Sequence, residues 1–147
     1  MSIVTRTVHT GFTIQNLERM SMFFRECLGL DVSEPRSPHR ADVLPEVTGV
    51  AGAQARIAMV TLPGHVIELL EYSAPESLTS SAPRPCDIGF AHIAIEVGNV
   101  PEVVDAAKSY GFAVGGSIYR ADGGPFSGRQ VAYVRDSGGF TIELIGP

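Results

Sequence analysis

The chain has 147 residues, of which 44% are hydrophobic and 18% charged, and it carries a formal net charge of −5. This size and apolar content are sufficient for a domain with its own core, and an acidic chain without a cluster of Lys and Arg excludes nucleic acid as an expected partner. No run reaches transmembrane length, no secretory leader is evident, and two cysteines make no disulfide framework. We therefore expect a cytoplasmic protein that binds small molecules and no membrane.

A strand followed by a helix is predicted near the start of the chain. Residues 7–14 alternate between two faces, which is the period of a half-buried strand, and His9 lies on one of these faces. Asn16 is suited to cap the helix that follows, and Gly29 is placed to end it. The apolar residues of this helix recur at helical spacing: Leu17, Met20, Phe23, Phe24, Cys27 and Leu28.

The first half is predicted to end in a hairpin. We expect a short strand around Asp31–Glu34 and then an irregular stretch over residues 35–55. The turn signal Pro63-Gly64 joins two further strands, the second of which carries Glu68. Alternation along that strand places Glu68 on the face opposite the apolar Ile67.

The second half repeats this order after a linker. Residues 73–87 contain three prolines and four serines without hydrophobic periodicity, which is typical of a connection between modules. A strand is then expected at 91–97 with His92 near its start. Asn99 is suited to cap the next helix and Gly111 to end it.

The last strands again lead to a glutamate. A short strand is expected at Phe112–Ser117, an irregular stretch at 117–129, and a turn at Asp136–Gly139 before the strand that carries Glu143. Long loops inside compact domains commonly bind ligands. We therefore expect substrate recognition in the 117–129 stretch and in its counterpart at 35–55.

The two halves are copies of one pattern. Adding 83 to His9 gives His92, and adding 75 to Glu68 gives Glu143. Such a repeat decides the architecture. It predicts an α+β fold of two tandem βαβββ modules that form a cupped mixed sheet with helices on its convex side. The first module, the linker and the second module are expected at 1–72, 73–87 and 88–147.

The four repeated side chains are candidate metal ligands. A carboxylate among apolar neighbours is costly to bury unless it is paired or coordinated. Two imidazoles and two carboxylates leave open positions on a six-coordinate ion such as Fe, Co, Ni, Mn or Zn, so that water or substrate can bind directly. Each residue taken alone is more typical of a structural histidine or a solvated glutamate. The repetition of His9, Glu68, His92 and Glu143 favours a metal centre.

Other titratable and charged residues are less well supported as members of the site. His39 and His65 have no counterpart in the repeat and are expected to be exposed, and Glu71 also lacks one. Two roles stay open for Glu96: a group beside the ligands, or the end of a strand. The arginines in or beside the long loops fit an anionic substrate as well as an ordinary charged surface. They are Arg36, Arg40, Arg56, Arg120 and Arg129.

Five segments carry a family resemblance: His9–Leu17, Phe24–Leu30, Ile67–Tyr72, His92–Val97 and Tyr133–Leu144. Together with the βαβββ repeat, they make the chain resemble the vicinal oxygen chelate superfamily. That group includes glyoxalase I, methylmalonyl-CoA epimerase, extradiol dioxygenases, fosfomycin-resistance enzymes and bleomycin-resistance proteins. The resemblance covers nearly the whole chain. It is specific for the fold and the metal site rather than for the reaction, because members differ in their loops.

The resemblance implies that His9, Glu68, His92 and Glu143 hold one divalent metal ion. A second carboxylate at Glu68 works against a ring-cleaving dioxygenase, which binds Fe(II) with two histidines and one carboxylate. We therefore expect an isomerase or lyase of the glyoxalase and epimerase type, in which the ion binds a substrate carbonyl and a carboxylate moves the adjacent proton. The candidate bases are Glu143, Glu68 and, by analogy with epimerases, Glu46.

Two alternatives stay open at this point. A single-domain Fe(II) dioxygenase would consume oxygen with a catechol, and a noncatalytic drug-binding protein would hold no metal. Members of the superfamily are commonly dimers, some with exchanged halves, so we expect a homodimer in which the four ligands come from one chain or from two. The substrate is expected to be a small molecule, anionic or a thioester.

Overall fold

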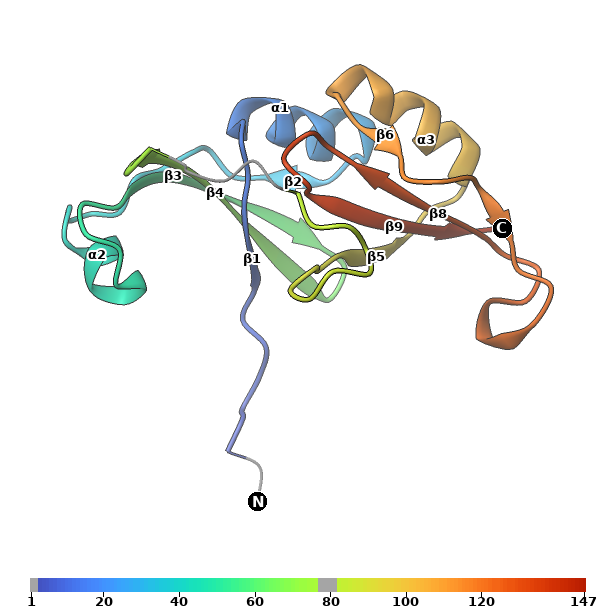
Figure 1. The fold of residues 1–147 in the computed structure, drawn as a ribbon, viewed down its shortest axis with the longest axis horizontal. Helices are drawn as coiled ribbons and strands as arrows, with labels where there is room; N and C mark the ends of the chain where they lie inside the picture. Colours follow the sequence, from blue (N-terminus) through green and yellow to red (C-terminus); the bar gives the residue numbers. More distant parts are fainter. Residues whose placement is uncertain (1–2, 77–81) are drawn as a thin grey trace. The chain divides into compact units, whose positions relative to one another are not determined.

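The computed structural model describes residues 3–76 and 82–147. The chain divides into two compact units, Met1–Thr79 (unit 1) and Ser80–Pro147 (unit 2), and each has its own sheet (Figure 1). The predicted α+β class is confirmed, because each unit combines helices with a sheet of parallel and antiparallel strands. The predicted linker at 73–87 overlaps the last strand of unit 1, and its residues 77–81 lie outside the described part of the chain.

The elements of unit 1 are β1 (Thr10–Thr13), α1 (Leu17–Met22), the π-helix η1 (Phe23–Cys27), β2 (Asp31–Val32), α2 (Val43–Thr48), β3 (Gln54–Leu62) and β4 (His65–Ala74). They form a sheet in the order β1-β4-β3-β2, in which β1 is parallel to β4 and the other neighbours are antiparallel. The predicted hairpin turn at Pro63-Gly64 is confirmed between β3 and β4. The first strand of the unit therefore lies beside its last strand.

α1 begins where the sequence predicts a helix. The side chain of Asn16 accepts a hydrogen bond from the backbone N–H of Arg19 at 2.8 Å, which satisfies a free donor of the first turn. The helix continues as η1, and the chain leaves it at Gly29, whose φ of +67° suits a residue without a side chain. α1 packs on β3 and β4 (Figure 1). The buried apolar side chains on the helix are Leu17, Met20, Phe23 and Phe24, and those on the strands are Ala58, Val60, Ile67 and Leu69.

The expectation that residues 35–55 are irregular is wrong for part of this stretch. It contains α2, which presents Leu44 to Ala53 and Ala55 in a small buried cluster, with Tyr72 of β4 packed against it. Ala55 pairs with Tyr72 in the sheet, so this cluster lies on the same face of β4 as Glu68, which is four residues away. α2 thus covers one end of the face that carries the candidate site.

The elements of unit 2 are β5 (Ile93–Glu96), α3 (Val100–Ala107), the 3₁₀ turn η2 (Lys108–Tyr110), β6 (Ala113–Val114), β7 (Tyr119–Arg120), the 3₁₀ turn η3 (Gly124–Phe126), β8 (Gln130–Arg135) and β9 (Thr141–Gly146). Their sheet has the order β5-β9-β8-β6, with β7 also paired to β8. β5 is parallel to β9, as β1 is to β4. The expectation of an irregular stretch at 117–129 is corrected, because it contains β7 and η3.

α3 repeats the construction of α1. The Asn99 side chain accepts from the backbone N–H of Glu102 at 3.1 Å, and Pro101 occupies the first turn, where its missing N–H costs nothing. Gly111 ends the helical segment with a φ of +82°. The buried apolar side chains of the helix are Val100, Val104 and Ala107. Among the described residues, no helix is long and apolar enough to cross a membrane.

Candidate metal centre and active site

The first predicted pair of ligands lies on one face of the unit 1 sheet. His9 directly precedes β1, which is shorter than the strand predicted at 7–14 because its pairing with β4 begins at Thr10. The Nε2 atom of His9 lies 3.3 Å from Oε2 of Glu68. As predicted from alternation, Glu68 lies on the face opposite the buried Ile67, and 22% of its side chain is exposed. The pair is therefore open to solvent and to a ligand.

The absence of a side chain at Gly11 leaves room for this pair. Gly11 is opposite Glu68 in the pairing of β1 with β4, and a Cβ at this position would lie 3.3 Å from Oε2 of Glu68. The corresponding residue of unit 2 is Ala94, which is opposite Glu143. The same register thus positions both carboxylates, with different space beside each.

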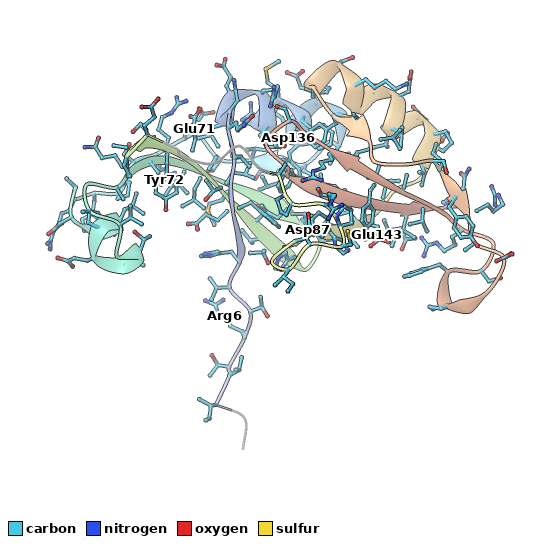
Figure 2. The ribbon with its side chains drawn as sticks, in the orientation of Figure 1. Arg6, Glu71, Tyr72, Asp87, Asp136 and Glu143 are labelled. Atoms are coloured by element: carbon cyan, nitrogen blue, oxygen red, sulfur yellow. The ribbon has the colours of Figure 1, made fainter. Side chains whose placement is uncertain are left out.

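The second pair has equivalent geometry in unit 2. The Nε2 atom of His92 lies 3.1 Å from Oε2 of Glu143, whose side chain is 19% exposed. Glu143 is labelled in Figure 2. Glu143 is the half-buried member of β9, and its neighbours Ile142 and Leu144 are fully buried on the opposite face. His92 directly precedes β5, as His9 precedes β1. Two strand registers therefore place one imidazole beside one carboxylate in each unit.

An aromatic group packs against the imidazole of His92. The rings of Phe90 and Tyr133 have centroids 5.8 Å and 5.0 Å from it, and the hydroxyl of Tyr133 lies 3.3 Å from its Nε2. The guanidinium of Arg135 lies 5.9 Å from the centroid of the Phe90 ring. Burial raises the pKa of the Tyr133 phenol, and the negative charge of Glu143 raises it further. The phenol is therefore kept protonated beside the imidazole.

Tyr133 was not among the residues singled out from the sequence, although a signal for it exists. Adding 74 to Met59 gives Tyr133, so the internal repeat places them in equivalent positions. Met59 is opposite Glu68, and Tyr133 is opposite Glu143. The repeat therefore predicts that the hydroxyl of Tyr133 lies on the face of the sheet that carries Glu143.

The other acidic candidates lie elsewhere. Glu46 is exposed on α2, a helix that packs near Tyr72, and Tyr72 is roughly 13 Å along β4 from Glu68 at the usual strand rise. Glu71, labelled in Figure 2, forms an ion pair with Arg56. Of the two roles left open for Glu96, the end of a strand is the observed one, because this residue ends β5 and is 74% exposed in an ion pair with an arginine.

The two remaining histidines differ from each other. His39 is exposed, as expected. The expectation that His65 is exposed on the hairpin turn is wrong, because His65 is the first residue of β4 and is half-buried. Its Nε2 lies 2.9 Å from the hydroxyl of Thr10 on the neighbouring strand. His65 therefore ties the start of β1 to β4.

The donors fit a divalent metal ion as two pairs. Within residues 3–76 and 82–147, no group of three or more His, Cys, Asp and Glu side chains is close enough to hold a metal. In each pair, however, an imidazole nitrogen faces a carboxylate oxygen on a partly exposed surface. These are the atoms that divalent Fe, Mn, Co, Ni and Zn bind. That all four side chains bind the same ion stays a prediction.

A model of the glyoxalase, bleomycin resistance protein and dioxygenase superfamily matches residues 8–133. The chain belongs to this superfamily. It is 34% identical over 145 residues to a 2-epi-5-epi-valiolone epimerase of Actinomyces sp., and the match covers 93% of this chain and 76% of the epimerase. It is 27% identical to a putative lactoylglutathione lyase of Brassica oleracea var. gemmifera, covering 95% of this chain and 44% of that protein.

Solved structures of the superfamily have the same fold. A glyoxalase family protein from Bacillus cereus aligns with a TM-score of 0.82 at 20% identity, covering 99% of this chain and 95% of that one. The fosfomycin resistance protein FosX of Listeria monocytogenes, in complex with Mn(II) and sulfate, aligns with a TM-score of 0.58 at 12% identity, covering 99% and 94%. The family model that matches residues 8–133 confirms the resemblance to the vicinal oxygen chelate superfamily, and these structures confirm its fold.

Proposed function

We propose that this protein is a metal-dependent epimerase that inverts a stereocentre next to a carbonyl group of a small organic substrate. The observation that carries the proposal is the His–Glu pair repeated at equivalent strand positions, with Nε2 to Oε2 distances of 3.3 Å and 3.1 Å. The similarity to an epimerase whose name denotes a ketone substrate supports the same reaction class.

We propose that His9, Glu68, His92 and Glu143 together hold one divalent ion. Each imidazole would give its Nε2, which in both units already faces a carboxylate oxygen. When bound, such an ion stabilises the negative charge that develops on a carbonyl oxygen as the adjacent proton leaves. The ligands come from one chain or from two copies of it, and in both cases the ratio is one ion per chain.

The two carboxylates have different tasks in an epimerisation. One of Glu68 and Glu143 accepts the proton at Oε2 as the carbon–hydrogen bond breaks, and the electron pair of that bond passes to the carbonyl system. The other carboxylate, which is protonated at the start, gives its proton to the same carbon from the opposite side, and this inverts the centre. General acid–base catalysis by a positioned carboxylate contributes about 10²- to 10⁴-fold to a rate. The two His–Glu pairs supply one such group in each unit.

The phenol of Tyr133 positions His92. The hydroxyl lies within hydrogen-bond distance of Nε2 at 3.3 Å, and its raised pKa keeps the proton on the phenol oxygen. A neutral imidazole nitrogen either donates or accepts one hydrogen bond, so Nε2 bonds either Glu143 as donor or Tyr133 as acceptor. In both tautomers one neighbour holds the ring in place before a metal ion binds at Nε2.

Hydrogen exchange in deuterated water tests the proposal. Protein loaded with Mn(II), Co(II), Ni(II), Fe(II) or Zn(II) in turn is incubated with 2-epi-5-epi-valiolone, and deuterium at the carbon next to the carbonyl is followed by NMR. We expect incorporation with the wild type and a loss of about 10²-fold or more in Glu68→Gln and Glu143→Gln. Glu102→Gln, on the surface of α3, is the matched control.

Two results would contradict the proposal. One is full exchange by both Gln variants. The other is an absence of exchange by the metal-loaded wild type with this ketone and with a panel of hydroxy ketones, their phosphate esters and acyl thioesters. Oxygen consumption with a catechol and Fe(II) would instead identify a dioxygenase.

A further inference from the structure

A hollow of about 300 Å³ opens on unit 1 over β3, the strand that pairs with the Glu68-bearing β4. Its floor is formed by Ile57 and Met59 of β3, and Met59 is directly opposite Glu68 in the sheet. Residues that are paired across strands project from the same face. The floor of the hollow is therefore on the face of the sheet that carries the carboxylate. The remaining lining residues come from the segment after β2: Ser33, Arg36, Ser37 and Pro38.

The wall of this hollow is fixed to the sheet by backbone hydrogen bonds. The N–H of Arg36 donates to the carbonyl of Ile57 at 2.8 Å, and the N–H of Ile57 donates back to Arg36 at 2.8 Å. The N–H of Ser33 donates to the carbonyl of Met59, and the hydroxyl oxygen of Ser33 accepts from the N–H of Met59. Because the bridge between Arg36 and Ile57 is antiparallel, both side chains project from one face. The guanidinium of Arg36 thus belongs to the face of Glu68.

Arg36 differs from the other arginines near the long loops. In the described part of the chain, its guanidinium forms no hydrogen bond or ion pair, whereas the other four are engaged. The partners are Asp42 for Arg40, Glu71 for Arg56, the carbonyl of Gly128 for Arg120, and Glu96 for Arg129. A free guanidinium offers a planar fork of donors that matches a carboxylate or a phosphate in a bidentate manner.

The spacing defines the size of ligand that reaches both groups. From Glu68 the path crosses two strand spacings and runs two residues along β3, which puts the Cα atom of Arg36 roughly 12 Å from that of Glu68. Because both side chains extend from the same face, the distance between the guanidinium and the carboxylate can be spanned by a small ring with one substituent. A hollow of about 300 Å³ is at the lower end of the volumes that hold small molecules.

We propose that Arg36 selects substrates that carry an anionic oxygen substituent, a phosphate or a carboxylate, a few ångströms from the reacting carbonyl. The inference rests on the proposed function for the identity of the reacting end, and it adds the substrate class. Ser37 lines the same hollow, and its hydroxyl would bind the same substituent. A neutral hydroxy ketone leaves the guanidinium without a counter-charge and binds more weakly.

Binding to cyclitols with and without an anionic group tests this inference without any turnover. The probes are myo-inositol 1-phosphate, quinate, inorganic phosphate and neutral myo-inositol, titrated into the protein by calorimetry and NMR. The variants are Arg36→Gln and Arg36→Lys. Arg40→Gln is the control, because it removes the same charge from the same segment but from a guanidinium already paired with Asp42.

We expect Arg36→Gln to weaken the binding of the anionic probes by about tenfold or more, the usual weight of a charge-assisted hydrogen bond. Arg36→Lys restores part of the affinity, since it keeps the charge but not the fork. Myo-inositol binding is unchanged in all variants, and Arg40→Gln behaves as the wild type. A higher affinity for myo-inositol 1-phosphate than for quinate identifies the substituent as a phosphate, and the reverse order identifies a carboxylate.

Equal losses in Arg36→Gln and Arg40→Gln would overturn the inference, since they would indicate a general effect of charge. Equal affinity of the wild type for myo-inositol and its phosphate would overturn it as well. Both readouts are independent of deuterium exchange. A chain that binds the anionic probes through Arg36 but exchanges no deuterium would retain this inference and reject the epimerase.

Discussion

The two units present the same His–Glu pair in different surroundings. In unit 1 the residue across the sheet from the carboxylate is Met59, and a hollow opens over it. In unit 2 the equivalent residue is Tyr133, whose hydroxyl contacts the imidazole of His92. The common donors indicate one shared task. From the different neighbours we propose that unit 1 admits the ligand while unit 2 holds its imidazole in position.

The largest expected effect is on metal binding. His9→Ala and His92→Ala should each lower the affinity for Mn(II) or Zn(II) by about 100-fold or more, because even partners that only orient a ligand contribute 10- to 100-fold. Calorimetry gives the affinity, and elemental analysis of the purified protein gives the stoichiometry, expected at one ion per chain. Two ions per chain, or a loss in only one variant, would mean that the pairs act separately.

The next effect concerns the glycines of the two sheets. A Cβ at Gly146 would lie 2.4 Å from the backbone carbonyl oxygen of Val97, which directly follows β5 and whose N–H donates to the carbonyl of Ile145. We expect Gly146→Ala to lower the free energy of unfolding by about 1–3 kcal/mol, as overpacking usually does. Chemical denaturation measures it.

Gly11→Ala is the matched substitution in unit 1. The new Cβ would meet Oε2 of Glu68 at 3.3 Å, the movable end of a side chain, and unit 2 already has Ala94 at the equivalent position. We expect a change in stability of less than about 1 kcal/mol, with a measurable change in metal affinity. A cost as large as that of Gly146→Ala would show that the face around Glu68 is as rigid as the core.

The two helix caps should be equivalent. Asn16 and Asn99 each accept a backbone hydrogen bond in the first turn, at 2.8 Å and 3.1 Å. Replacing either by Ala should cost about 1 kcal/mol, and the double variant about twice as much. Thermal denaturation of the three variants tests this, and a strongly unequal pair would mean that one unit unfolds independently of the other.

The smallest effect is a pH dependence specific to unit 2. The raised pKa of Tyr133 means that the folded protein holds this proton more tightly than the unfolded chain, so the associated stability is present below the ordinary tyrosine pKa and is lost as the pH rises through the raised value. Glu143→Gln in metal-free protein should lower the pKa of Tyr133, and Glu102→Gln should not. An NMR titration of the tyrosine ring decides, and an unchanged pKa in Glu143→Gln would contradict the electrostatic account.

The parts of the fold that follow local rules could be predicted from the sequence. The caps at Asn16 and Asn99 and the alternation around Glu68 depend on neighbours within a few residues, and they were correct. α2 was missed because its six residues include Pro45 and offer only one buried apolar side chain, Leu44. A helix that short shows no periodicity from which to predict it.

The parts of the site that depend on distant pairing could not be read in the same way. The bridge between Arg36 and Ile57 joins segments about twenty residues apart through backbone groups, which leave no trace in residue type. The sequence therefore offered five equivalent arginines, and only ion pairs in the folded chain distinguish Arg36 from Arg56. Tyr133 was within reach, because the repeat aligns it with Met59.

One edge of each sheet is formed by a strand of only two residues, β2 in unit 1 and β6 in unit 2, with β7 as a second short partner of β8. A strand from another molecule needs a continuous row of unpaired backbone groups to attach. The backbone groups on this side of β8 already form hydrogen bonds, because β6 and β7 pair with it and the N–H of Gly115 donates to the carbonyl of Tyr133 beyond the end of β6. At these edges concentrated protein should therefore resist the growth of fibrils.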